Sequence, residues 1–267
     1  MDRTPVVFIH GAWLRASSWE SWAERFAMRG FRALAPAWPG EGPGTGPPVA
    51  APDVLGGVGL DALTDHYAAV ARSLGSSPVL IGHSVGALVA QHLVGAEVGR
   101  AAVAIAPAPV GGVALPAGAA GTWRPPDPAA TGPLVSLTAH RFRRVLANTV
   151  EAAESDRLFA RHAMPSPRRL LADLAAPAPG VLPDTGNAAR GPLLLVSGQE
   201  DRLVPDSVTR AAYKRYGDCT AVTDLKQFAD RGHCLVLDGG WRSVADYVLT
   251  WLDGHGIGGA RPARALR

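Results

Sequence analysis

The chain has 267 residues, of which 47% are hydrophobic and 18% charged, so it can bury the core of one α/β domain that carries an insertion. Its formal net charge of +3 equals the three arginines among the last seven residues, and the near-neutral remainder argues against a nucleic-acid-binding protein. Gly, Pro or charged residues interrupt every apolar run before it reaches the roughly 18 residues that span a bilayer. We therefore expect no membrane association.

The cysteine content and the first residues bear on the compartment. Cys219 and Cys234 are too few for a disulfide framework. The first residues lead directly into an apolar run at residues 6–9, without the basic and apolar regions of a signal peptide. Both features predict a cytoplasmic protein.

Short apolar runs alternate with longer segments of helical periodicity along the chain. The expected strands are residues 6–9, 32–35, 79–81, 102–105, 193–196 and 221–228. The expected helices between them are residues 17–28, 60–74, 85–94, 207–216 and 241–252. This alternation predicts a doubly wound α/β fold with a mostly parallel sheet, whose central strands are apolar because helices cover both faces.

Two stretches interrupt the alternation. Residues 40–59 are rich in Gly and Pro and are expected to form a loop. Residues 107–190 separate two expected strands, and we interpret them as a helical lid; a separate domain is the alternative, although about 80 proline-rich residues are few for independent folding. The predicted organisation is a core of residues 1–106 and 191–255, a lid of residues 107–190 and a disordered tail of residues 256–267.

The strongest functional signal is a G-x-S-x-G motif at residues 82–86, centred on Ser84. An apolar strand-like run precedes the motif and a helix-like segment follows it, which is the context of a nucleophile elbow. Such a turn holds the serine in a strained conformation, and Gly82 and Gly86 let the backbone pass closely. Ser84 is the candidate nucleophile.

A serine hydroxyl needs a base, and the base needs an acid that orients it. His233 lies between a strand-like segment and the last expected helix, where a loop can present it at the sheet edge. Asp201 follows the expected strand 193–196 and gives the order Ser, Asp, His along the chain that a nucleophile elbow of this kind predicts. The rivals are His140 for the base, and Glu200 and Asp206 for the acid.

Acyl transfer also requires hydrogen-bond donors for the developing oxyanion. The main-chain N–H of Val85, directly after the nucleophile, is one expected donor. The other is the N–H of Ala12, which follows Gly11 in the loop after the first recognised strand. Taken alone, His10-Gly11 would be an ordinary turn at the end of a strand.

These motifs, His10-Gly11-Ala12-Trp13, Gly82 to Gly86, Gly198 to Asp201 and Arg231 to His233, resemble in their order the α/β-hydrolase superfamily, especially small capped bacterial serine esterases. The resemblance implies an eight-stranded, mostly parallel sheet, a lid between the sixth and seventh strands, and no cofactor or metal. Serine at the elbow distinguishes the chain from haloalkane dehalogenases and epoxide hydrolases, which resemble it but have an aspartate there.

The expected function is cleavage of an ester, lactone or thioester of a small or medium apolar substrate through an acyl-enzyme. The candidate substrate-binding residues, each of which could instead pack in the core or the lid, are Trp13, Trp38, Trp123, Leu137, His140 and Phe142. A lyase or cyclase could use the same three residues without hydrolysis. A receptor-like protein that only binds a ligand is a further alternative, although binding alone would not require a complete triad.

Overall fold

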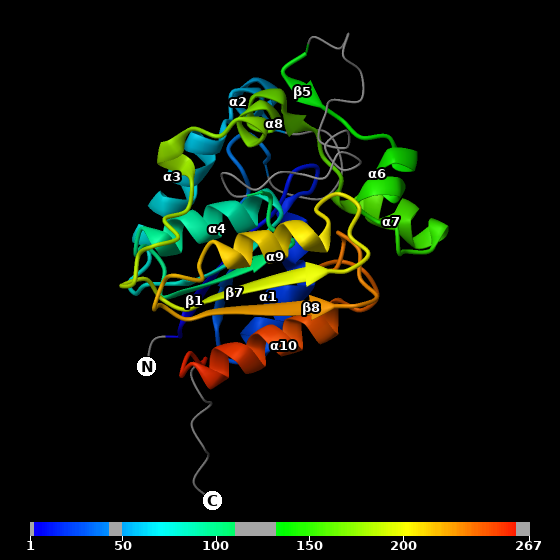
Figure 1. Cartoon of the computed structure of the whole chain (residues 1–267). Coiled ribbons are helices and arrows are strands. Elements are labelled where there is room, and N and C mark those ends of the chain that lie inside the picture. The colour runs from blue at the N-terminus through cyan, green and yellow to red at the C-terminus, as the bar shows by residue number, and fades with distance from the viewer. Residues whose placement is uncertain (1–2, 43–49, 110–131, 260–267) are drawn as a thin grey trace, which may run out of the picture.

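The computed structural model describes residues 3–42, 50–109 and 132–259, which form a parallel sheet with helices on both faces (Figure 1). The strands of this sheet are β1 Pro5–Ile9, β2 Arg32–Leu34, β3 Val79–His83, β4 Ala101–Ile105, β7 Leu193–Gly198 and β8 Thr223–Phe228. They lie in the order β2-β1-β3-β4-β7-β8, and every neighbouring pair is parallel. The doubly wound α/β prediction is confirmed.

The sheet has six strands among the described residues, rather than the eight that the resemblance implies. Each of the six expected apolar runs forms one of these strands. The remaining two strands, β5 Leu134–Val135 and β6 Ser166–Pro167, pair with each other in a separate antiparallel sheet. The expected strand count was therefore wrong for the described part of the chain.

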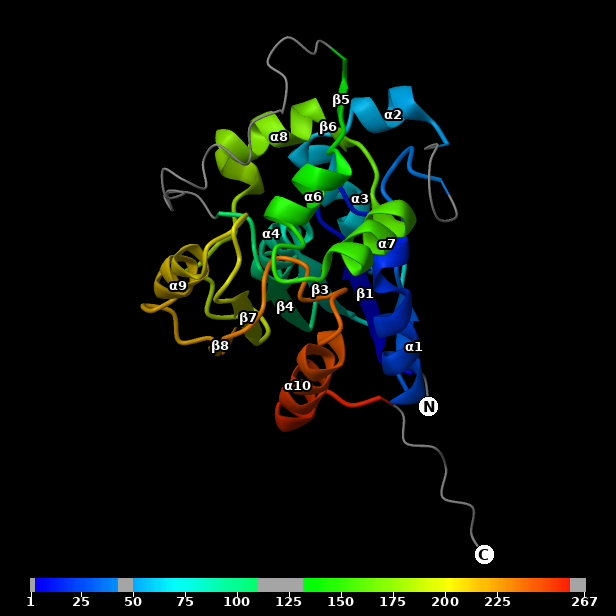
Figure 2. The same ribbon diagram turned by 90° about the vertical axis from the view of Figure 1, so that its right-hand side faces the viewer.

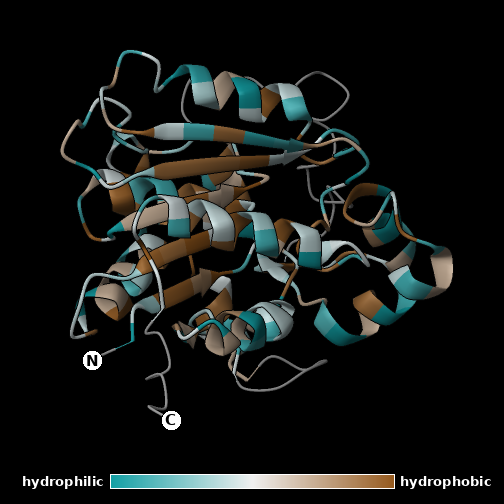
Figure 3. Ribbon diagram, turned by 90° about the horizontal axis from the view of Figure 1, so that it is seen from below, coloured by the Kyte–Doolittle hydropathy of each residue, from teal (hydrophilic) through white to brown (hydrophobic). Residues whose placement is uncertain are grey.

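The central strands are apolar because they are buried on both faces. Every residue of β1, β3, β4 and β7 is buried, and these strands are the brown centre of Figure 3. In β1, Val7 and Ile9 join one hydrophobic cluster, whereas Val6 and Phe8 join the other. Successive side chains of a strand point to opposite faces, so one apolar run contributes to two cores.

Helices on the two faces complete these cores (Figures 1 and 2). One face is covered by α3 Leu60–Arg72, α4 Val85–Gly95 and α9 Asp206–Lys214. The short helix η1 Ala16–Trp19 leads into α1 Glu20–Met28, which covers the other face together with α10 Trp241–Gly254. All of these helices lie where the sequence predicts helices. A further short helix, α2 Pro52–Gly56, lies within the expected loop at 40–59. Its first residue is proline, which suits the first position of a helix.

The described part of the insertion, residues 132–190, contains β5, α6 Ala139–Val145, α7 Ala152–His162, β6, α8 Arg168–Ala175 and η2 Pro179–Val181. Helix α6 begins directly after Thr138, whose side chain caps it by accepting a hydrogen bond from the Arg141 N–H at 3.2 Å. Both α6 and α7 lie beyond the carboxyl ends of the strands (Figures 1 and 2). The insertion therefore stands at the edge of the sheet where the candidate catalytic residues are expected.

The end of the chain packs further than expected. Ile257 is 8% exposed and belongs to the cluster under α1 and α10, and the Thr4 hydroxyl donates a hydrogen bond to the Gly258 carbonyl at 2.8 Å. The expected tail at 256–267 thus begins too early, and residues 260–267 lie outside the described residues. No helix of the described chain is both long enough and apolar enough to cross a membrane.

Candidate active site

Ser84 occupies a strained turn between β3 and α4. Its φ of 56° and ψ of −117° place a non-glycine residue in a region that costs about 1–3 kcal/mol. A side chain at Gly86 would put its Cβ 2.1 Å from the Ile9 carbonyl oxygen, so only glycine lets α4 approach β1 this closely. The turn that the G-x-S-x-G motif predicts is therefore present, with Ser84 at its apex.

His233 and Asp201 form a buried pair on the loops that follow β8 and β7. His233 Nδ1 lies 2.7 Å from Asp201 Oδ2. The other oxygen, Oδ1, accepts hydrogen bonds from the N–H groups of Leu203 and Val204, each at 2.8 Å. These bonds fix the carboxylate, which holds the proton of the imidazole on Nδ1 and leaves Nε2 free to act as a base.

The structure distinguishes Asp201 from the alternative acids. The Asp206 carboxylate binds Ser197, Gln227 and, at 2.8 Å, the Nε of Arg210. Glu200 is exposed, as is His140, the rival candidate for the base. Asp201 is thus the carboxylate that contacts His233.

His83 joins the Ser84 turn to the His233 loop. Its Nε2 lies 2.9 Å from the His233 carbonyl oxygen, and the two rings are 4.6 Å apart between centroids. Burial, and then the neighbouring His233, hold the pKa of His83 well below its usual value, so the ring is neutral and its Nε2–H donates. In the sequence, His83 stands out only as a member of the G-x-S-x-G motif.

No hydrogen bond joins Ser84 Oγ to His233 within the described chain. Bonds between a nucleophile and its base are often long or poorly aligned until substrate binds. Because β3, β7 and β8 are parallel, the residues that follow them meet at one edge of the sheet. Ser84, Asp201 and His233 therefore belong to one site.

The candidate oxyanion donors lie on either side of Ser84. Residues 10–13, which we call the His10 loop, pass directly over it: a Cβ on Gly11 would be 2.7 Å from the Ser84 Cβ. Val85 is the first residue of α4, so its N–H has no acceptor within the helix. Neither the Ala12 N–H nor the Val85 N–H donates to another group of the described residues. Both are therefore available to a ligand.

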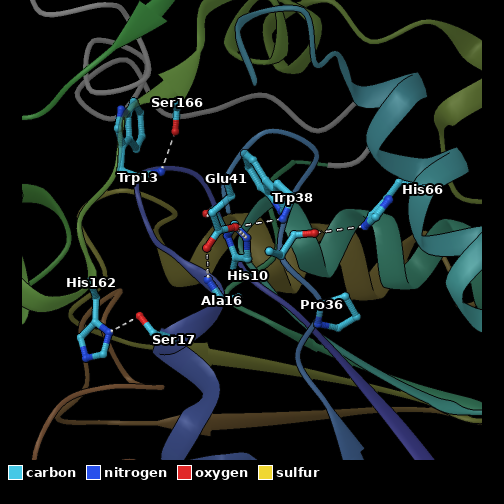
Figure 4. A network of polar contacts seen from close by, with 12 residues as sticks. His10, Trp13, Ala16, Ser17, Pro36, Trp38, Glu41, His66, His162 and Ser166 are labelled. Carbon is cyan, nitrogen blue, oxygen red and sulfur yellow. Dashed lines mark hydrogen bonds and ion pairs between the residues drawn. The ribbon is translucent and has the colours of Figure 1, made fainter. Parts of the chain in front are cut away.

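The insertion holds the His10 loop through polar contacts (Figure 4). The Trp13 N–H donates to Ser166 Oγ at 2.6 Å, and its indole N–H donates to the Val135 carbonyl at 3.1 Å. The Met164 N–H donates to the Trp13 carbonyl at 3.2 Å. Trp13 has a φ of 61°, which is strained for a bulky residue and is held by these contacts.

The insertion also contacts the acid and histidine loops. Asn148 donates from its side-chain amide to the Glu200 carbonyl at 2.8 Å. The Cys234 N–H, next to His233, donates to the Leu146 carbonyl at 2.9 Å. Residues of the insertion thus contact the loops that follow β1, β7 and β8, and each of these loops carries a candidate site residue.

The candidate substrate-binding residues have diverse positions. Trp13 and Trp38 are buried, and Trp38 stacks on His10. Leu137 and Phe142 are also buried, and Phe142 packs edge-on against Phe159 with 5.5 Å between ring centroids. His140 is exposed on α6, and Trp123 lies outside the described residues. For Trp13, Trp38 and Phe142, these contacts agree with the packing alternative.

No group of three or more His, Cys, Asp or Glu side chains within the described ranges is arranged to hold a metal ion. Cys234 lies next to His233 but is fully buried, and burial holds the pKa of its thiol far above the usual range. This thiol is therefore not a second nucleophile.

The comparisons agree with this architecture. A model described as the alpha/beta hydrolase family matches residues 6–247, so the chain belongs to the alpha/beta hydrolase family. No curated protein matches it in sequence.

Several solved structures have the same fold. A methylesterase from Arabidopsis has a TM-score of 0.67 and 16% identity, over 94% of this chain and 99% of that chain. The monoacylglycerol lipase of Paleococcus ferrophilus has a TM-score of 0.69 and 19% identity, over 96% and 100%. Polyneuridine aldehyde esterase has a TM-score of 0.69 and 15% identity, over 94% and 99%. At these identities the likeness concerns the fold alone.

Proposed function

We propose that the chain is a serine hydrolase that cleaves an ester, lactone or thioester of a small or medium apolar substrate. The observation that carries the proposal is the 2.7 Å contact between His233 and Asp201, at the edge of the sheet where the strained turn holds Ser84. The names of the similar structures, which include esterases and a lipase, favour ester chemistry for this chain as well.

The proposed reaction has two steps. Ser84 Oγ attacks the acyl carbon and transfers its proton to His233 Nε2, while Asp201 stabilises the imidazolium. The N–H groups of Ala12 and Val85 donate to the oxyanion of the tetrahedral intermediate. When the intermediate collapses, His233 protonates the leaving alcohol or thiol. Water, activated by His233, then attacks the acyl-enzyme and releases the acid and free Ser84.

We also propose that residues 107–190 act as a lid. The support is the position of α6 and α7 beyond the ends of the strands, and the contacts of the segment between them with the acid and histidine loops. Phe142 of α6, Leu158 of α7 and Leu146 between them belong to the larger hydrophobic cluster. Such a cover would exclude water from the acyl-enzyme until substrate and product exchange.

Ester turnover tests the proposal. A panel of p-nitrophenyl esters of increasing acyl length, with thioesters and lactones, would be assayed with the wild type, Ser84→Ala and Ser76→Ala; Ser76 is exposed on a loop away from the site. We expect Ser84→Ala to lower kcat/KM by at least about 10⁴-fold, as expected for loss of a nucleophile. Ser76→Ala should match the wild type. Equal turnover by Ser84→Ala would refute the serine mechanism.

A further inference from the structure

A buried carboxylate lies behind the His10 loop (Figure 4). Glu41 is 2% exposed and accepts three hydrogen bonds, from the N–H of Ala16 at 2.8 Å, the N–H of Trp38 at 2.9 Å and His10 Nε2 at 3.0 Å. Burial alone would raise the pKa of Glu41, but the charge and hydrogen bond of His10 and the two N–H donors outweigh it and lower this pKa. Glu41 is therefore an anion.

The contacts of His10 determine its protonation. Its Nε2 faces the Glu41 carboxylate at 3.0 Å, and its Nδ1 faces the Gly11 carbonyl oxygen at 3.0 Å. Both partners are acceptors, so both ring nitrogens must carry a proton for both bonds to form. His10 is thus an imidazolium, fully buried and stacked on the Trp38 indole with 4.4 Å between ring centroids.

The bond to the Gly11 carbonyl matters for the candidate oxyanion hole. The Gly11 C=O and the Ala12 N–H belong to the same planar peptide group and point in opposite directions. A donor that fixes the carbonyl therefore fixes the direction of the N–H as well. A charged donor also polarises the peptide, because hydrogen bonds in series strengthen one another, and this makes the Ala12 N–H a better donor.

We infer that the buried His10–Glu41 pair is a positioning device for the oxyanion hole: Glu41 keeps His10 charged, and His10 orients and polarises the peptide that carries the Ala12 N–H. The inference rests on the proposed function, because it assigns the pair to the acyl-transfer transition state. Neither side chain touches the substrate. Their effect is transmitted through the Gly11–Ala12 peptide.

Three titratable groups that interact with the pair, His83, His66 and Tyr67, are neutral near pH 7. Burial holds the pKa of His83 well below its usual value and also lowers that of His66, and His10 contributes to both shifts. Burial and the Glu41 charge raise the pKa of Tyr67 well above its usual value. Among these groups, Glu41 is therefore the anion that stabilises the imidazolium of His10.

The test compares the wild type with Glu41→Gln, which keeps the size of the side chain and removes its charge. We expect kcat to fall by about 10-fold or more while KM changes by less than about 2-fold, because the oxyanion forms only in the transition state. Without the charge of Glu41, the Gly11–Ala12 peptide is less polarised, so the loss should fall on kcat and spare KM. A loss of structure alone would not confine the loss to kcat.

The matched control is Asp224→Asn. Asp224 lies near the start of β8, away from the candidate site, where it accepts a hydrogen bond from the Trp251 indole at 2.7 Å and lies 3.8 Å from His255 Nε2. Its removal breaks a similar group of acid, histidine and tryptophan, and should leave kcat and KM unchanged. Glu41→Asp, which keeps the charge, should lower kcat less than Glu41→Gln does, at the wild-type KM.

The outcomes separate two failures. A wild type that neither turns over esters nor reacts with a serine-directed probe would refute the proposed function. An active wild type with the same kcat as Glu41→Gln would overturn the positioning role alone. If Glu41→Gln does not fold, Glu41→Asp decides: a modest fall in kcat at the wild-type KM supports the role, and an unchanged kcat, or a loss that falls on KM instead, overturns it.

Discussion

The two sides of the candidate site are held by different means. The Ser84 turn and the loops of Asp201 and His233 follow buried parallel strands, so the sheet itself brings them together. The His10 loop also follows a strand, but it is held by Glu41 on one side and by the insertion on the other. The candidate nucleophile and base thus depend mainly on the core, whereas the Ala12 N–H, one of the candidate oxyanion donors, depends on contacts far apart in the sequence.

Among the contacts that the core holds in place, substitution of the candidate acid, Asp201, is expected to have the largest effect on turnover. We predict that Asp201→Asn lowers kcat by about 10³–10⁴-fold, because an amide cannot hold His233 in the required tautomer or stabilise its charge. The measurement is ester turnover by folded variants. Asp206→Asn, which removes a nearby, partly buried carboxylate bound to Ser197 and Gln227, should reduce stability and change kcat by less than about 3-fold. A larger loss in Asp206→Asn would show that the acid is misassigned.

A smaller effect is expected where the insertion holds the His10 loop. Ser166→Ala removes the hydroxyl that accepts the Trp13 N–H at 2.6 Å. We predict a loss of about 1 kcal/mol in the free energy of unfolding, and a fall in kcat of about 10-fold as the loop shifts. Denaturant unfolding and ester turnover measure the two effects.

The control for this change is Ser155→Ala. Ser155 is a buried serine of α7 in the same insertion, and its hydroxyl has no hydrogen-bond partner within the described chain. Its removal should leave both stability and kcat nearly unchanged. If both variants behave alike, the contact with Trp13 does not position the loop.

The smallest expected effect concerns pH and the contact between the insertion and η1. Burial, reinforced by Arg161, lowers the pKa of His162 to about 4, whereas an unfolded histidine titrates near pH 6.5. Between these values the unfolded chain binds the proton more readily, so stability contributed by neutral His162 is lost as the pH falls from about 6.5 to about 4.

Denaturant unfolding at about pH 7 and about pH 4.5 would measure this effect. His162→Gln should show a smaller loss of stability on acidification than the wild type. His140→Gln, which changes an exposed histidine of α6, controls for the substitution itself. The same loss of stability in His162→Gln and the wild type would contradict the role of His162.

Local patterns carry most of what the sequence predicts. The strands of the core are continuous apolar runs, and α4 and α10 begin at the expected residues. The G-x-S-x-G pattern predicts the strained turn at Ser84 because its glycines and its place between strand and helix are visible in the sequence. The pairing of His233 with Asp201 also follows from the order of their loops along the chain.

Long-range contacts are less accessible from one sequence. Glu41 lies in a Gly/Pro-rich stretch without periodicity, so nothing local distinguishes it from an exposed loop residue. The only local indication in the sequence is that Glu41 is charged, whereas the residues around it are apolar or small. The strands β5 and β6 have two residues each, too few for a periodic pattern, and pair across the insertion.

The central claim is that Ser84 is a reactive nucleophile, and covalent labelling tests it most directly. Intact-protein mass spectrometry after treatment with a fluorophosphonate would compare the wild type, Ser84→Ala and Ser76→Ala. The account predicts one adduct on the wild type and on Ser76→Ala, and none on Ser84→Ala. A folded wild type that forms no adduct, or an adduct that persists in Ser84→Ala, would contradict it.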